Sequence, residues 1–254
     1  MRSIWKGTIN FAVVAIPAKL YTATDDKRVS FHQIHGPCGS RLQMPKWCPK
    51  CERKAEQNEI KKGYELSEEN HVILEDSDFQ QLPLKTLKTI EVIEFVDLAT
   101  IDPRCFEDSY FLSCEKTGAK AFALFLKAME KHNVVAVAKL CYRDRENLAV
   151  VQPYDNIMLL QRLHYADELR PYEELKPQAV GISDKELEMA VALVKAMITG
   201  FDLNKYRDEY REALEAMIQA KIAGTPITAS QPVAAPVTDV ADALIKSLEM
   251  MGAK

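Results

Sequence analysis

The apolar positions in the first two thirds of the chain follow the short, closely spaced pattern of β-strands. Residues 8–16, TINFAVVAI, predict a buried strand that ends at Pro17, because proline interrupts the ladder of a central strand. Further strands are expected at residues 71–74, 88–96, 110–114, 134–142, 148–152 and 157–164. Only the turns Arg143–Asn147 and Pro153–Asn156 separate the last three, and such short connections favour an antiparallel barrel or meander.

Two parts of the chain have a helical period instead. Ala119–His132 contains no helix breaker and predicts one helix. Further along, Ser183 and Glu186 form a capping-box pattern ahead of apolar residues at helical spacing, and Gly200 is placed to end that helix. A second helix is expected from about residue 204 to 222, so that residues 183–222 form a helical pair.

The end of the chain reads as a linker followed by a short helix. Residues 223–238 contain three prolines and no charge, which is typical of a mostly extended linker. Within residues 239–254, the apolar positions Val240, Leu244 and Leu248 line one side of an amphipathic segment. This helix either docks on its own domain or is tethered for the groove of a partner, and the linker permits both.

Composition places the chain among globular proteins of one large or two modest domains. It has 254 residues, and no apolar run approaches the ~20 residues that span a bilayer. The first ten residues contain no apolar signal core, so we expect a cytoplasmic protein. The formal net charge of −4 argues against a nucleic-acid partner only if the charge is spread evenly.

The charge is not spread evenly. Residues 1–63 carry 12 Lys and Arg against 5 Asp and Glu, a net charge of +7, whereas residues 64–118 carry 4 against 13. One interpretation is accidental clustering on a solvated surface. The other is a basic surface for a polyanion, with the acidic surface facing away from it.

A cluster of cysteine and histidine lies within the basic part of the chain. It reads His35-x2-Cys38-x9-Cys48-x2-Cys51, in a stretch that is too poor in apolar residues to order itself by burial. Three thiolates and one imidazole at this spacing predict a structural Zn²⁺. His32 is the competing fourth ligand.

Other interpretations of the cluster remain open. Cys38 is a free thiol in one of them, and only Cys48 and Cys51 lie close together. A redox CxxC is another, although that motif usually opens a helix in a βαβ unit. The odd number of cysteines and the expected cytoplasmic location disfavour a disulfide. A catalytic zinc is disfavoured because four protein ligands leave no position for water.

Catalytic motifs are missing from the sequence. It contains no GxxxxGK[ST] loop, GxGxxG, HExxH or GxSxG, and no pair of carboxylates stands out as an acid and a base. The histidines outside the cysteine cluster stand alone, and a lone histidine is more often structural than catalytic. We therefore expect a protein that is not an enzyme.

A series of motifs along the chain resembles the prokaryotic Ku proteins. In order they are RSIWKGTINF (2–11), IPAKLY (16–21), FHQIHxxCGSR (31–41), CPxC (48–51), KGYE (62–65), IEVIEFVD (90–97), IDP (101–103) and YADELR (165–170). The resemblance extends over residues 1 to about 222. The cysteine cluster is not universal in that family, so the prediction of zinc rests on the residues of this chain.

The resemblance implies a fold and an assembly. The fold class would be α+β, mainly β: an antiparallel Ku-type β-barrel with a bridge that closes a ring in a homodimer, followed by C-terminal helices. The implied organisation is a core at residues 1–182 with its bridge at about 26–63 and a zinc-ribbon-like part at 32–51, then the helical pair at 183–222, the linker at 223–238 and the last helix at 239–254.

The resemblance also implies a function. Ku rings thread onto the ends of broken double-stranded DNA and recruit an ATP-dependent DNA ligase, of the ligase D type, for non-homologous end joining. Such a protein is nucleoid-associated in the cytoplasm, has no membrane partner and has no established enzymatic role in that step. Many relatives end in a lysine-rich tail, but residues 225–254 contain only Lys246 and Lys254, so we expect little DNA binding by this tail.

DNA contacts are expected from cations that face the phosphate backbone, because break repair must accept any sequence. The candidates are Lys27, Arg28, Arg41, Lys46, Lys50, Arg53 and Lys54 in the bridge, Lys6 and Lys19 near the N-terminus, and Arg143 and Arg145 at a strand turn. Each of them is equally well explained as part of a solvated surface. The helices at 183–222 and 239–251 are the candidates for contact with the ligase.

Two other functions compete with the DNA-end clamp. A zinc-ribbon scaffold that binds only protein would show no salt-sensitive retention of DNA. A metal-dependent nuclease would degrade DNA, but the sequence lacks a carboxylate motif for that chemistry.

Overall fold

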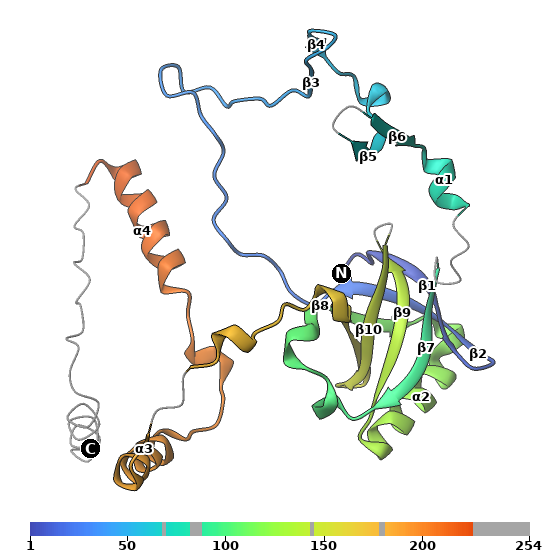
Figure 1. Ribbon diagram of the computed structural model, residues 1–254, viewed down its shortest axis with the longest axis vertical. Helices are drawn as coiled ribbons and strands as arrows, with labels where there is room; N and C mark the ends of the chain where they lie inside the picture. The colour runs from blue at the N-terminus through green and yellow to red at the C-terminus, as the bar shows by residue number, and fades with distance from the viewer. Residues whose placement is uncertain (68–69, 82–87, 143–144, 178–180, 226–254) are drawn as a thin grey trace. The chain divides into compact units, whose positions relative to one another are not determined.

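The computed structural model describes residues 1–67, 70–81, 88–142, 145–177 and 181–225 (Figure 1). Arg143, the last helix and nearly all of the predicted linker lie outside these residues. The chain divides into two units, one made of residues 1–27 and 31–171 and the other of residues 28–30 and the chain from 172 onward. Each unit is described by itself.

Seven strands of the first unit close into a barrel. They are β1 (Trp5–Phe11), β2 (Val14–Thr22), β7 (Thr89–Val96), β8 (Phe106–Cys114), β9 (Val135–Tyr142), β10 (Arg145–Tyr154) and β11 (Ile157–Leu163). The order around the barrel is β1-β2-β8-β11-β10-β9-β7. Neighbouring strands are antiparallel except for β1 and β7, which are parallel and close the barrel. The predicted α+β, mainly β fold with an antiparallel barrel is confirmed.

Alternation along these strands fills the barrel. Ile9, Ile90, Leu112 and Leu160 are all completely buried, as the period of two requires of inward positions. The long helix α2 (Ala119–His132) has the bounds that the sequence predicts, and it packs Phe122, Phe125, Leu126 and Met129 into the same core. Asn133 ends the helix in the left-handed conformation.

The predicted strand at 8–16 is wrong in its bounds, because the chain folds back within it. Ala12 takes a left-handed φ of 49°, and Ala12 and Val13 form the tight turn of the β1–β2 hairpin. Pro17 lies inside β2, opposite Thr8. The Thr8 N–H points away from Pro17 and donates to the Lys88 carbonyl at 3.1 Å, so the missing N–H of the proline costs the hairpin no hydrogen bond.

The rest of the first unit consists of short elements. Two small hairpins are formed by β3 (Trp47–Cys48) with β4 (Arg53–Lys54) and by β5 (Lys62–Ser67) with β6 (Asn70–Leu74), and α1 spans Asp76–Gln80. Short 3₁₀ turns cover Gln57–Glu59, Leu98–Thr100, Pro103–Cys105, Lys116–Gly118 and Ala166–Glu168. β6 matches its prediction, whereas β5 was not predicted.

The second unit contains α3 (Asp184–Met197) and α4 (Glu209–Ala223), with 3₁₀ turns at Glu173–Leu175 and Leu203–Lys205. The predicted capping box is confirmed, since the Glu186 carboxylate accepts from the Ser183 N–H at 2.8 Å. Gly200 does not end the helix, because the backbone is already extended at Ile198.

The second helix of the pair begins later than predicted. Asp208 caps its start, the backbone before it is extended at Tyr206, and Gly224 ends it with a φ of 69°. No helix among the described ranges combines the length and the apolar character needed to cross a bilayer.

Candidate nucleic-acid interface

The predicted bridge, residues 26–63, is named the basic segment here. It carries 9 Lys and Arg against 4 Asp and Glu. All of its residues are described, and none of them is buried. Because no apolar core orders this segment, local turns and polar contacts must do so.

One tight turn of the basic segment brings His35 and Cys38 together. The His35 N–H donates to the Ser40 carbonyl at 2.8 Å, and the Gly39 N–H donates to the His35 carbonyl at 2.8 Å. Gly39 has a φ of +68°, which favours glycine. The turn leaves His35 Nδ1 at 3.0 Å from Cys38 Sγ.

A second tight turn connects β3 and β4 and holds Cys48 and Cys51. The register pairs Cys48 with Arg53, and Glu52 takes a left-handed φ of 51° between them. Hydrogen bonds from the backbone and the side chain of Cys51 lower the pKa of Cys48. Beyond the turn, the two terminal nitrogens of the Arg53 guanidinium donate to the two oxygens of the Glu59 carboxylate, at 2.9 and 2.5 Å. This bidentate pair fixes Arg53.

The structure thus forms the predicted zinc ligands as two separate pairs. Within the described residues, no three His, Cys, Asp or Glu side chains come together to hold a metal ion. The chemistry of the first pair suits zinc, because hydrogen bonds from Ser40 and then His35 lower the pKa of Cys38 to about 7, which favours the thiolate. In the second pair the hydrogen bond with Cys48 raises the pKa of Cys51. His32 is exposed. Binding of zinc, and the choice between His32 and His35, stay predictions.

Nine of the eleven predicted DNA contacts fall into two groups. Four are engaged in ion pairs: Lys19 with Glu115, Lys27 with Asp25, Arg53 with Glu59 and Arg145 with Glu168. Five others are exposed and form no ion pair with any described residue: Lys6, Arg41, Lys46, Lys50 and Lys54. Arg28 has an interaction of its own, and Arg143 is not described. The second group is therefore the one that offers unshared positive charge.

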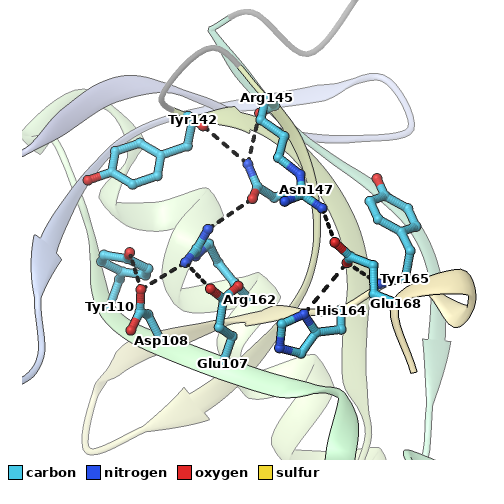
Figure 2. Close-up of polar contacts among 10 residues, drawn as sticks. All are labelled: Glu107, Asp108, Tyr110, Tyr142, Arg145, Asn147, Arg162, His164, Tyr165 and Glu168. Carbon is cyan, nitrogen blue, oxygen red and sulfur yellow. Dashed lines mark hydrogen bonds and ion pairs between the residues drawn. The ribbon is translucent and has the colours of Figure 1, made fainter. Parts of the chain in front are cut away.

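A polar cluster that sequence reasoning missed surrounds Arg162 on β11 (Figure 2). The Arg162 side chain is 15% exposed, and its guanidinium donates to Glu107 at 2.7 Å and to Asp108 at 2.8 Å. It also donates to the buried Asn147 side chain at 3.0 Å, and the Asn147 amide donates to the Arg145 carbonyl at 2.8 Å. The cluster ties β8, β10 and β11 together.

Arg145, one of the predicted DNA contacts, is paired with a carboxylate in the same region. Its guanidinium donates to the Glu168 carboxylate, which also accepts from the Tyr165 N–H at 2.9 Å (Figure 2). These two contacts, that of Arg145 first, lower the pKa of Glu168. A phosphate would have to compete with Glu168 for this cation. Arg162 within an apolar strand and Glu168 within the YADELR motif were the available signals for this cluster.

Comparison with a family model gives a match over most of the described chain. The model is that of the Ku70/Ku80 beta-barrel domain, and it matches residues 10–189. The match includes the basic segment, the last two residues of β1, the other six barrel strands and the start of α3.

Comparison with curated proteins gives relatives along nearly the whole chain. A protein of Archaeoglobus fulgidus is 42% identical over 251 residues, 98% of this chain and 99% of that protein. A protein of Symbiobacterium thermophilum is 40% identical over 98% of this chain, which spans only 63% of that relative. One of Bacillus subtilis is 33% identical over 98% of this chain and 81% of its own. All three are named "Non-homologous end joining protein Ku".

Proposed function

The chain belongs to the Ku family, whose members are named for end joining rather than for an enzymatic reaction, and from this premise we propose that it binds the ends of double-stranded DNA. Binding is independent of sequence, and the working form is a ring-shaped homodimer. The dimer recruits an ATP-dependent DNA ligase of the ligase D type, so that double-strand breaks are repaired by non-homologous end joining.

The observation that carries DNA binding is the basic segment. It combines an excess of positive charge with a surface location, since none of its residues is buried, and Arg41, Lys46, Lys50 and Lys54 have no carboxylate partner among the described residues. Lysine and arginine that contact phosphates give affinity without base readout, which suits a protein that must accept any end. The acidic remainder of the chain disfavours binding along intact duplex by other surfaces.

The helices of the second unit support the homodimer. α3 leaves Leu187, Val194 and Met197 between 54% and 61% exposed, and α4 leaves Tyr210 77% exposed. Contiguous apolar surface of this kind is usually covered by a partner. A second copy would cover it and would double every DNA contact of the basic segment.

The experiment that tests DNA-end binding compares linear with covalently closed circular duplex over a salt series. We expect retention of linear DNA that falls steeply with salt, and little retention of circles. Equal retention of the two forms would overturn the ring. Sedimentation of the free protein tests the dimer, and co-sedimentation with a purified ligase D tests recruitment.

A structural Zn²⁺ is part of the proposal, held by Cys38, Cys48 and Cys51 with His35 as the fourth ligand. The paired ligands in two tight turns support it, and the ion would supply the order that burial does not supply in the basic segment. Metal analysis of the purified protein is expected to give about one zinc per chain. A metal-free protein would refute the site. Loss of zinc in His32→Ala but not in His35→Ala would identify His32 as the fourth ligand in place of His35.

A further inference from the structure

The two faces of the β3–β4 hairpin carry different side chains. The register pairs Trp47 with Lys54, and Cys48 with Arg53. Directly opposed residues share a face and successive residues alternate, so Trp47 lies with Lys54 on one face and the other pair lies on the opposite face. That opposite face is already engaged, since it holds a predicted zinc ligand and the ion pair of Arg53 with Glu59.

Trp47 has no packing partner that would explain a tryptophan at this position. Its side chain is 60% exposed, and within the described residues its ring neither stacks on another aromatic ring nor lies under a cation. The other tryptophan of the chain, Trp5, packs against the barrel core. Tryptophan combines a large apolar area with little conformational freedom, which is why it is enriched at binding surfaces.

The backbone around Trp47 is held in place before any partner binds. The Ala55 N–H donates to the Lys46 carbonyl at 2.8 Å, which continues the strand pairing by one residue. On the other side of the Trp47–Lys54 pair, Arg53 is fixed by its bidentate contact with Glu59. The ring is therefore presented by an ordered hairpin, which lowers the entropic cost of binding.

Unshared positive charge surrounds the ring. Residues 46–54 carry four Lys and Arg against one acidic residue, Glu52. Lys46 and Lys54 also line one hollow of about 710 Å³, whose polar lining is completed by Gln43, Gln57 and Glu56. Two lysines against one carboxylate, together with two amides that can donate, favour an anionic group such as a phosphodiester in this hollow.

We propose that Trp47 stacks on an unpaired base of a DNA end, and that Lys54 and Lys46 contact the phosphates of that strand. This inference rests on the proposed binding of DNA ends and adds a class of substrate to it, ends with a single-stranded overhang. In a duplex the neighbouring bases cover both faces of each base, whereas an unpaired base leaves a face free for an aromatic ring. Stacking of this kind accepts every base, as the repair of any end requires.

The test measures the affinity of the full chain for three DNA molecules. They are a blunt duplex, the same duplex with a short single-stranded thymidine tail at each end, and the same duplex with abasic tails of equal length. Because the two tails carry the same phosphates, the difference between them reports the bases alone. We expect the thymidine tail to bind about fivefold or more tightly than the abasic tail. This ratio should stay constant over a salt series, since both tails release the same counterions.

Variants of exposed aromatic residues assign the stacking to Trp47. Trp47→Ala should abolish the preference for the thymidine tail and leave the retention of blunt duplex unchanged, whereas Trp47→Phe should keep most of the preference because a phenyl ring still stacks. Tyr64→Ala on β5, where the side chain is 64% exposed, is the control and should keep the full preference. The thymidine tail should also quench the tryptophan fluorescence of the unmodified chain more than the abasic tail does. That difference should vanish in Trp47→Ala, which retains only Trp5.

The outcomes separate this stacking site from DNA-end binding itself. Equal affinity for the two tails, with blunt duplex still retained, would overturn the stacking site alone. Loss of retention of all three DNA molecules would overturn DNA-end binding and the stacking site with it. If Trp47→Ala weakened all three equally, Trp47 would support the fold of the basic segment, and if it shifted the protein to a smaller species in sedimentation, its face would belong to a second copy. Either result would overturn the stacking site.

Discussion

The barrel and the basic segment of this chain are ordered by different interactions. The barrel strands alternate apolar and polar positions around a core in which Ile9, Ile90 and Leu160 are completely buried. The basic segment has no buried residue over residues 26–63 and is held by turn hydrogen bonds and polar pairs. Stability and positive charge are therefore concentrated in different regions, so that substitutions should affect folding or DNA binding but rarely both.

The largest expected effect tests the barrel side of this comparison. Leu160→Ala removes a completely buried side chain and should lower the free energy of unfolding by about 2–5 kcal/mol, through reduced burial and the cavity that remains. The matched variant Leu42→Ala, in the basic segment where the side chain is 49% exposed, should change it by less than ~0.5 kcal/mol. Chemical denaturation measures both. Similar losses in the two variants would contradict the division.

A smaller effect is expected from the polar cluster in the barrel. Asn147→Ala removes the acceptor of Arg162 and the donor to the Arg145 carbonyl, at a site that is 5% exposed. Buried polar groups left without partners should cost about 1–3 kcal/mol of unfolding free energy. The exposed Asn58→Ala is the control and should stay within ~0.5 kcal/mol. A neutral Asn147→Ala would show that the cluster is not needed for the fold.

The barrel could be predicted from the sequence because its elements depend on local period. The strands predicted at 88–96, 134–142 and 157–164 match β7, β9 and β11 to within one residue, since a short apolar strand needs no distant partner to be recognised. The β1–β2 hairpin could not be predicted in this way. Its turn uses Ala12 at positive φ, and its proline is tolerated because it lies opposite Thr8, whose N–H donates to the distant Lys88 carbonyl.

The sequence could predict which segment carries the cations of the candidate site, but not which of these cations form ion pairs. Lysine and arginine mark the basic segment in the sequence, but Glu59 lies six residues from Arg53 and Glu168 lies 23 residues from Arg145, and only the fold brings these carboxylates close. Arg162 was missed for the same reason, because its partners Glu107 and Asp108 are more than 50 residues away. Charge counts alone cannot separate unshared cations from paired ones.

A smaller effect is expected on the salt dependence of DNA binding, without a change in stability, when lysines of the basic segment are removed. Lys50 and Lys54 are exposed, and in the described chain neither has a carboxylate partner. Salt dependence is the slope of the logarithm of DNA affinity against the logarithm of salt concentration. Lys50→Ala with Lys54→Ala should reduce the size of this slope by about one for each lysine–phosphate interaction that the substitutions remove. The thermal midpoint of the barrel should not move. Lys120→Ala with Lys127→Ala on α2, a control that removes the same charge from exposed positions, should leave the salt dependence unchanged.

The smallest expected effect concerns a single ion pair that orders the basic segment. The Arg53 side chain, and after it the Glu56 N–H, lower the pKa of Glu59 to about 2, from an ordinary value of 4.5. Because the folded pKa lies below the unfolded one, the pair stabilises its turn above about pH 4.5, and this contribution is lost as the pH falls towards 2.

Carbon-13 NMR of the glutamate carboxyls should therefore show Glu59 still charged at pH values near 4. Arg53→Gln should raise its pKa towards the ordinary value, whereas the pKa of Glu115, which Lys19 lowers in the barrel unit, should not respond. If Arg53→Gln also lowered the thermal midpoint of the barrel at neutral pH, the basic segment would be coupled to the core, and the division between the two regions would not hold.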